Sequence, residues 1–234
     1  MRVAVCCVLV VFLLVGCWRV QQWNFSDGQI VVDLSTLSWV SIATEGINYF
    51  LLDDSDVQKF VSKGIPLWDK EYEPTDLVGI QGSSSLIIQG NLRLREEANE
   101  QLIQLSLAFY EVFHEPIVVM SAYRSYQYQK NQIAESCKQS GYCAREGESE
   151  HQLGLAVDLW EATNEEKFLS KYQLYYDWLV ANAYFYGFHQ SYQKGKEIDG
   201  YPVEPWHWRY VWADLAALLW ERQMTFSEWV VSSL

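Results

Sequence analysis

The sequence predicts an α+β fold, with a small antiparallel sheet flanked by helices, from three observations. Apolar residues recur at three- to four-residue spacing over residues 92–113, which indicates an amphipathic helix. Short β-branched or alternating apolar segments at 117–120 and 153–159 indicate strands. Further helical patterns follow towards the C-terminus, and helices segregated around a few short strands are typical of this class.

The elements of the first half follow in order. Apolar stretches broken by Asp, Ser and Gly over residues 30–52 indicate strands or an irregular preface. Residues 63–77 are rich in turn residues and interrupted by Pro, so they are expected to form extended loop. The helix 92–113 can be capped by Asn91, and the strand 117–120 follows it.

The second half is predicted to be mainly helical. A second helix is expected over about 125–140, ended by Gly141. Residues 163–166 have the spacing of a capping box, which would open one or two helices that end at Gly187. Residues 213–223 form the last amphipathic helix.

Composition sets limits on the class of protein. The 234 residues fit one domain with a short preface, and half of them are hydrophobic, so the chain can bury a sizeable core and is not disordered. The formal net charge of −13 argues against nucleic acid as a partner, because such binding depends on Lys and Arg neutralising phosphates. The 11 Trp, 15 Tyr and 10 Phe suit either a tightly filled core or a groove for a peptide or sugar.

The N-terminus has the pattern of a secretory signal. Arg2 precedes an apolar run from Val3 to Val15, which is shorter than the roughly 20 residues needed to span a bilayer. Leu14-Val15-Gly16-Cys17 resembles the lipobox of bacterial lipoproteins, in which the Cys is lipidated. The alternative is an uncleaved anchor helix that stops at Arg19. Both interpretations place the rest of the chain outside the cytoplasm.

These signals divide the chain into segments. Residues 1–16 are predicted to be a signal peptide and residues 17–29 a lipidated N-terminus and tether. Residues 30–62 would form an N-terminal extension, and residues 63–234 the main domain. We expect a monomer held at a membrane, in the periplasm or at the cell surface, through its lipid anchor.

Two cysteines remain in the predicted mature domain, Cys137 and Cys143. In an oxidising compartment a local disulfide between them is expected. The alternatives are free thiols or metal ligands, but their spacing differs from the tight spacing of common zinc-binding cysteine pairs.

Four residues in the C-terminal half have the chemistry of a zinc site. Zinc binds imidazole nitrogen and carboxylate oxygen, and a catalytic zinc site uses three protein ligands and one water. His151, Asp158 and His207 would supply the three ligands. Glu204 would be the carboxylate that takes a proton from the attacking water.

The spacing of these residues sets a condition on the backbone. In a regular strand His151 and Asp158 would face opposite sides, so we predict a break at Gly154. Glu204 and His207 are three residues apart, and a turn at Pro205 would bring both side chains to one side.

Three ordered motifs carry a resemblance to a known family. They are S-x-Y-R-S-Y-x-x-Q from Ser121 to Gln129, S-x-H-x-x-G-x-A-x-D from Ser149 to Asp158, and E-P-W-H-x-R-Y-V from Glu204 to Val211. The sequence resembles the VanY-type zinc D,D- and L,D-carboxypeptidases, which have the hedgehog/D-Ala-D-Ala peptidase fold. The likeness covers roughly residues 63–211.

The resemblance implies a role for each motif. His151, Asp158 and His207 would bind zinc, and Glu204 would be the catalytic base. Arg124 would hold the terminal carboxylate of the substrate or stabilise the oxyanion, and Gln129 and Ser149 would lie near the substrate. The implied activity is removal of a terminal D-Ala from a peptidoglycan stem peptide. An endopeptidase or dipeptidase of the same fold and a non-catalytic wall-binding lipoprotein are the alternatives.

Simpler interpretations compete with some of these roles. Glu204 could form an ion pair with Arg209, and Arg124 could be a structural salt-bridge partner. His189 is expected to be a pocket or surface residue rather than a fourth ligand. The family often has Pro after the Tyr that matches Tyr192, whereas this chain has Gln193, so one wall of the pocket could differ in shape.

Overall fold

A computed structural model describes residues 24–26, 29–31, 47–133, 143–160 and 173–233. The chain divides into two compact units, Met1–Trp39 and Val40–Leu234. In the first unit β1 (Asn24–Ser26) and β2 (Gln29–Val31) form an antiparallel hairpin. The predicted signal peptide, the lipobox and the capping box at 163–166 lie outside the described residues.

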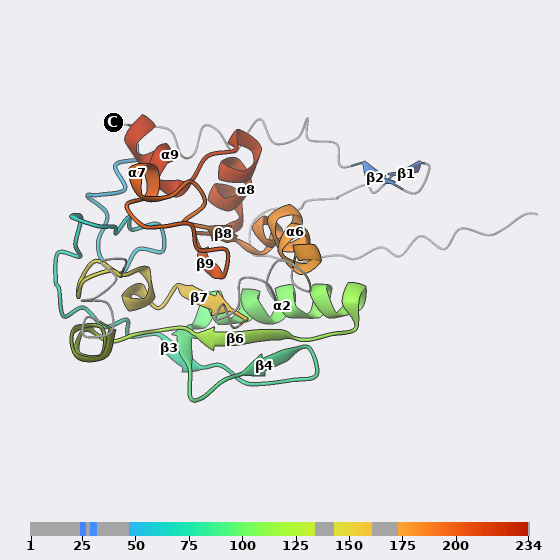
Figure 1. The fold of residues 1–234 in the computed structure, drawn as a ribbon, viewed down its shortest axis with the longest axis horizontal. Coiled ribbons are helices and arrows are strands. Elements are labelled where there is room, and N and C mark those ends of the chain that lie inside the picture. The colour runs from blue at the N-terminus through green and yellow to red at the C-terminus, as the bar shows by residue number, and fades with distance from the viewer. Residues whose placement is uncertain (1–23, 27–28, 32–46, 134–142, 161–172, 234) are drawn as a thin grey trace, which may run out of the picture. The chain divides into compact units, whose positions relative to one another are not determined.

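The sheet of the second unit has five strands in the order β4-β6-β7-β9-β8 (Figure 1). They are β4 (Leu86–Ile88), β6 (Ile117–Ser121), β7 (Ala156–Leu159), β9 (His207–Tyr210) and β8 (Phe188–Gln190). The α+β prediction is confirmed. The sheet is mixed rather than wholly antiparallel, because β4 pairs with β6 in the parallel direction.

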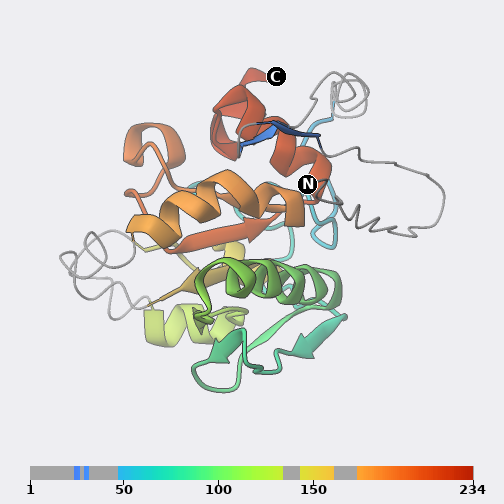
Figure 2. The same cartoon turned by 90° about the vertical axis from the view of Figure 1, so that its right-hand side faces the viewer.

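The first predicted helix is shorter than expected. Helix α2 is Glu96–Phe113, because residues 93–95 form β5 (Arg93–Arg95), which pairs with β3 (Leu77–Gly79). The cap at Asn91 is therefore wrong, and Arg95 stands at the N-cap instead. Strand pairing has overridden the local helical pattern. Helix α2 contacts β4 and β6 and lies along the sheet (Figure 2).

The second predicted helix begins where expected, at Ser125. Helix α3 covers only Tyr126–Tyr128, and its N-cap Ser125 accepts a hydrogen bond from the backbone N–H of Tyr128. A π-helical turn, Gln129–Ile133, continues it, and residues 134–142 lie outside the described chain. Cys143 is disulfide-bonded, which agrees with the predicted bridge, while Cys137 falls in the part that is not described.

The strand predicted at 153–159 begins only at Ala156. The preceding residues Glu150–Leu153 form a 3₁₀ turn, and Gly154 follows in the left-handed conformation with φ 65°. The predicted break at Gly154 is therefore confirmed, and it explains why the strand is shorter.

The C-terminal helices are α6 (Gln173–Asn182), the 3₁₀ helix Ala183–Tyr186, α7 (Lys196–Asp199), α8 (Ala213–Arg222) and α9 (Phe226–Ser232). They contact one another, and two of them, the 3₁₀ helix and α8, contact the edge strand β8. The predicted helix end at Gly187 is confirmed, and the helix predicted at 213–223 is present as α8. Contrary to the prediction it is not the last helix, because α9 follows it. Aromatic contacts join α6 to α2, since the Phe109 ring lies 5.1 Å from that of Tyr175 and 5.4 Å from that of Trp178.

Residues 47–62 belong to the second unit and contribute to its core. Val57, Phe60 and Val61 are buried, and Lys59 forms a buried ion pair with Asp54 (Nζ–Oδ1 3.3 Å). The division between residues 30–62 and 63–234 stays a prediction, although residues 47–62 pack with the residues that follow them. In the described part of the chain, no helix combines the length and hydropathy needed to cross a membrane.

Candidate metal centre and active site

The three predicted ligands converge although they come from distant parts of the chain. His151 lies in the 3₁₀ turn, Asp158 on β7 and His207 on β9, where Asp158 and His207 are directly paired. One ligand atom from each residue lies within 4.8 Å of the other two. Asp158 Oδ1 is 3.3 Å from His151 Nε2 and 3.3 Å from His207 Nδ1. His151 and His207 are buried, and the Asp158 side chain is 13 % exposed.

Gly154 gives His151 its position. Its φ of 65° is a conformation that L side chains rarely adopt, and a Cβ added there would lie 2.8 Å from Leu77 Cδ2. This turn changes the direction of the chain between His151 and Asp158, so that both side chains reach the same point. The two residues would face opposite sides of a regular strand, and the turn at Gly154 removes that obstacle, as predicted.

Each imidazole is fixed by a hydrogen bond on the side away from the centre. His151 Nδ1 donates to the Ala122 carbonyl at 2.8 Å, which leaves Nε2 to face Asp158. His207 Nε2 lies 2.8 Å from Glu150 Oε2, and its Nδ1 faces Asp158. Outer partners of this kind are typical of histidines that bind metals.

The electrostatics of the site fit a cation. Burial, and after it the nearby positive charge of Arg124, lower the pKa of His151 to about 4. Burial alone would also lower the pKa of His207, but hydrogen bonds to Asp158 and Glu150 outweigh it and raise that pKa to about 9. Without a metal, His207 therefore holds a proton between two carboxylates. A divalent cation would replace that positive charge and meet two imidazoles and one carboxylate, the donor set that zinc prefers.

Glu204 lies next to this centre, in the turn that precedes β9. His207 N–H donates to the Glu204 carbonyl at 3.1 Å, which closes the predicted turn at Pro205. The backbone of Glu204 is also held by Tyr192, whose carbonyl accepts from Glu204 N–H at 2.9 Å, and by the Gln190 side chain at 3.2 Å. Burial raises the pKa of Glu204 to about 7, which suits a general base near neutral pH. The alternative pairing with Arg209 is wrong, because Arg209 binds Glu150.

Arg124 lies at the edge of the same centre. Its Nη2 donates to Asp158 Oδ2 at 2.6 Å and its Nε donates to Ser121 Oγ at 3.0 Å. The side chain is 20 % exposed, more than any of the three ligands. Arg124 is therefore both an ion-pair partner of a ligand and a guanidinium that reaches solvent.

The two predicted substrate residues are buried. Gln129 Nε2 donates to the Ala144 carbonyl at 2.6 Å, while its Oε1 has no hydrogen-bond partner among the described residues. Ser149 stands at the start of the 3₁₀ turn that carries His151, and its carbonyl accepts from Gln152 N–H at 3.0 Å. Their contact with a substrate stays a prediction.

Glu150, Ser191, Tyr192 and Arg209 complete the surroundings of His207 and were not predicted. Glu150 binds His207, Arg209 and Ser191. The Tyr192 ring stacks on His207 with centroids 4.6 Å apart. One signal was available in the sequence: Arg209 shares a strand face with His207, and a charged residue on a buried face needs a partner.

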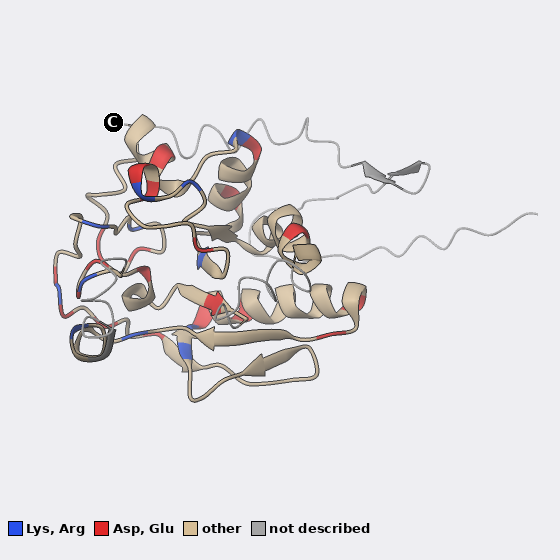
Figure 3. Cartoon of the chain, in the orientation of Figure 1, with Lys and Arg blue, Asp and Glu red and all other residues tan. Residues whose placement is uncertain are grey.

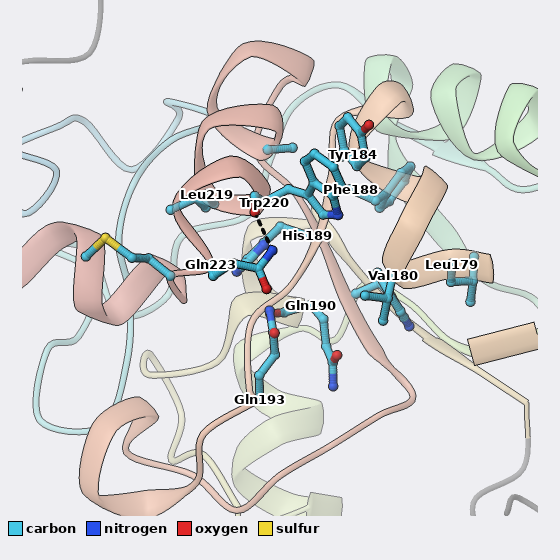
Figure 4. A pocket seen from close by; sticks show the side chains of 13 residues that line it. Leu179, Val180, Tyr184, Phe188, His189, Gln190, Gln193, Leu219, Trp220 and Gln223 are labelled. Carbon is cyan, nitrogen blue, oxygen red and sulfur yellow. Dashed lines mark hydrogen bonds between the residues drawn. The ribbon is translucent and has the colours of Figure 1, made fainter. Parts of the chain in front are cut away.

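His189 lies apart from the three ligands, as predicted. It lines a cavity of about 50 Å³ beside β8, together with aromatic residues of the 3₁₀ helix and α8 and several Gln side chains (Figure 4). Burial lowers the pKa of His189 to about 4, so its imidazole is neutral. Acidic and basic residues are distributed over the described elements (Figure 3), so the charge of −13 does not by itself mark a site.

Comparison with known proteins agrees with this geometry. Residues 91–213 match the family described as VanY, D-alanyl-D-alanine carboxypeptidase. The putative carboxypeptidase YodJ of Bacillus subtilis is 36% identical over 169 residues, which are 68% of this chain and 61% of YodJ. A D-alanyl-D-alanine carboxypeptidase of Enterococcus faecalis is 33% identical over 48% of this chain and 47% of its own length. The chain thus spans less than two thirds of each of these relatives.

Solved structures show the same fold. The LdcB LD-carboxypeptidase superposes with a TM-score of 0.66 at 27% identity, covering 92% of this chain and 94% of that protein. The vancomycin resistance D,D-pentapeptidase VanY, solved in complex with Zn(II), gives a TM-score of 0.55 at 26% identity, covering 73% of this chain and 97% of that one. The match to the family extends over more than half of the chain and includes every residue of the converging centre. The chain belongs to the VanY family of D-alanyl-D-alanine carboxypeptidases.

Proposed function

We propose that the protein is a zinc-dependent carboxypeptidase that removes a terminal D-Ala from peptidoglycan stem peptides. The observation that carries this proposal is the convergence of His151, Asp158 and His207, with the partly buried Glu204 held beside them by its backbone. The relatives named above support the class of substrate.

The three ligands would hold the zinc ion through His151 Nε2, Asp158 Oδ1 and His207 Nδ1. When bound, the ion supplies Lewis-acid polarisation of the scissile carbonyl and acidifies a water molecule. Glu204 accepts the proton of the attacking water and passes it to the departing amino group of D-Ala. Its raised pKa makes both proton transfers accessible near neutral pH.

Arg124 would bind the free carboxylate at the end of the substrate. Asp158 and Ser121 hold its Nη2 and Nε, and this fixes the plane of the guanidinium. We assign the remaining nitrogen, Nη1, to the substrate carboxylate, because a guanidinium is permanently charged and matches carboxylate geometry.

Replacement of Glu204 by Gln tests the catalytic step. Gln cannot take up a proton, so Glu204→Gln is expected to lower kcat/KM on a D-Ala-terminated pentapeptide by at least about 100-fold. Zinc content, measured by elemental analysis, is expected to stay at one ion per chain. Wild-type activity in this variant would refute the assignment of Glu204.

Product analysis separates the kinds of peptidase. The purified zinc-loaded protein is offered a pentapeptide stem, a tetrapeptide stem, the D-Ala-D-Ala dipeptide and a cross-linked stem, with and without a chelator. Release of single D-Ala, lost on chelation, supports a carboxypeptidase, and the stem that is cut gives its D,D- or L,D-specificity. Cleavage of the dipeptide or the cross-link alone would favour the alternatives. Stoichiometric zinc with no cleavage would indicate a non-catalytic wall-binding protein.

We also propose that the protein acts as a monomeric lipoprotein outside the cytoplasm. The signal-like N-terminus and the lipobox-like segment ending at Cys17 support this location, and so does the disulfide at Cys143. Cys17→Ser is expected to abolish incorporation of labelled fatty acid and to move the protein from the membrane fraction to the soluble one. Unchanged membrane association would favour the anchor helix.

A further inference from the structure

The imidazole of His207 lies between two carboxylates that have different tasks. Its Nδ1 faces Asp158 in the metal centre, and its Nε2 lies 2.8 Å from Glu150 Oε2 on the opposite side of the ring. Glu150 is 2 % exposed, and its carboxylate does not belong to the converging ligand set. This buried carboxylate thus contacts the metal centre only through a ligand.

Glu150 is itself held from two further directions. Arg209 Nη1 donates to Glu150 Oε1 at 2.9 Å, and Ser191 Oγ donates to Glu150 Oε2 at 2.6 Å. Arg209 is completely buried and also donates through Nη2 to the carbonyls of Val57 and Lys59. The carboxylate is therefore a fixed acceptor, with both oxygens in use.

The chemistry of imidazole gives this contact a consequence. A neutral imidazole has one N–H and one lone pair, and the hydrogen bond made by one nitrogen decides which nitrogen is free to bind a metal. An acceptor at Nε2 keeps the proton there and presents the lone pair of Nδ1 to the centre. Tyr192, stacked on the ring at 4.6 Å, restricts its rotation.

We propose that Glu150 is a positioning residue that sets the tautomer and orientation of His207 for metal binding. The proposal rests on the metal site of the proposed function, but it concerns metal affinity and not the substrate. Arg209 and Ser191 support Glu150 in this role by fixing both of its oxygens.

The substitution Glu150→Gln tests the proposal with almost no change in shape. A Gln amide has one acceptor and one donor end, so either His207 N–H or Arg209 N–H then faces another donor. If the amide nitrogen faces His207, the ring is driven to the other tautomer, with its proton on Nδ1. Competition with a chromogenic chelator is expected to show a roughly 10- to 100-fold loss of zinc affinity. Glu146→Gln, in the loop before the site, is the matched control and is expected to bind zinc as the wild type does.

Glu150→Asp distinguishes the effect of the negative charge from the effect of side-chain length. It keeps the negative charge for Arg209 but withdraws the acceptor from His207 by about the length of one C–C bond, beyond normal hydrogen-bond distance. A loss of zinc affinity like that of Glu150→Gln supports the positioning role. Wild-type affinity in the folded Glu150→Asp variant, which cannot place an acceptor on His207 Nε2, would overturn it. Thermal unfolding of the metal-free variants shows whether they are folded at the temperature of the titration.

A measurement on the wild type keeps the proposal testable if the variants do not fold. The chain has four His, and ¹⁵N–¹H spectra of the zinc-loaded protein distinguish protonated from metal-bound ring nitrogens. Assignment uses substitution of His114 and His189. His207 is expected to carry its proton on Nε2 and its metal on Nδ1. A metal on Nε2 would refute the proposal, whereas zinc binding without peptide cleavage would refute only the proposed function.

Discussion

At the scale of single residues, the environment that suits Glu204 to its proposed role as a base also carries a cost in stability. Burial raises the pKa of this carboxyl from 4.5 to about 7, so the folded protein opposes its ionisation. Between about pH 4.5 and 7, Glu204 is therefore protonated in the native state but ionised in the unfolded chain. The free energy of unfolding therefore falls as the pH rises through this window.

Glu204→Gln should remove that cost. The metal-free variant is expected to be more stable than the metal-free wild type at pH 8, by on the order of 2 kcal/mol, and about equally stable at pH 4. Urea unfolding at the two pH values measures the difference. A variant that is no more stable at pH 8 would contradict the view that burial dominates the environment of Glu204.

The sequence predicts residues well when their chemistry is specific and local motifs surround them. The convergence of His151, Asp158 and His207 could be predicted because zinc requires their donor types and the three motifs order them. Glu150 could not, because its partners Ser191 and Arg209 are distant in sequence and meet it only through the pairing of β9 with its neighbours. Such a role depends on strand register, which cannot be predicted from the sequence of one segment.

At the scale of elements, the turn at Gly154 controls the geometry of the metal centre. It separates the 3₁₀ turn that carries His151 from β7, which carries Asp158. The backbone there is left-handed, and the space for a Cβ is occupied by the Leu77, Arg95 and Pro74 side chains. Both conditions demand glycine.

Comparison of Gly154→Ala with Gly64→Ala separates the two conditions. Gly64 has a similar φ of 78°, but nothing lies within 4 Å of an added Cβ, so its replacement should cost only roughly 1–2 kcal/mol of backbone strain. Gly154→Ala should cost about 1–3 kcal/mol more, because packed side chains must move, and it should also weaken zinc binding. Denaturant unfolding and chelator competition test this. Equal losses in the two variants would show that the packing around Gly154 is unimportant.

Helices were predicted best where one apolar face meets the core and a clear end signal follows. Helix α8 and the end at Gly187 were found for this reason. The start of α2 was misplaced, because Arg93–Arg95 also fit the helical pattern but pair with Leu77–Gly79. The parallel pairing of β4 with β6 was missed as well, since a three-residue strand such as Leu86–Ile88 has too little pattern to show its partner.

At the scale of the whole molecule, residues 47–62 complete the core around the site. Val57, Phe60 and Val61 are buried, and the carbonyls of Val57 and Lys59 bind Arg209. These residues precede the part of the chain that matches the family, residues 91–213. The matching segment is therefore smaller than the unit that folds.

Two truncated chains test whether residues 47–62 are needed for folding. A chain that begins at residue 47 is expected to fold and bind zinc, whereas one that begins at residue 63 is expected to aggregate or lose zinc affinity. The loss of three buried apolar side chains alone costs roughly 5 kcal/mol, which is comparable with the stability of many domains. Circular dichroism and zinc titration compare the two. Equal folding of the shorter chain would contradict the structural role given to residues 47–62.

The hydrogen bonds from Arg209 to Val57 and Lys59 join positions 152 and 150 residues apart. A growing polypeptide therefore cannot finish the surroundings of its metal centre until almost all of it has been synthesised, and closing so long a loop delays the last step of folding. The proposed hydrolytic activity would then arise only once the chain is complete, so an unfinished copy would be unable to cut peptides.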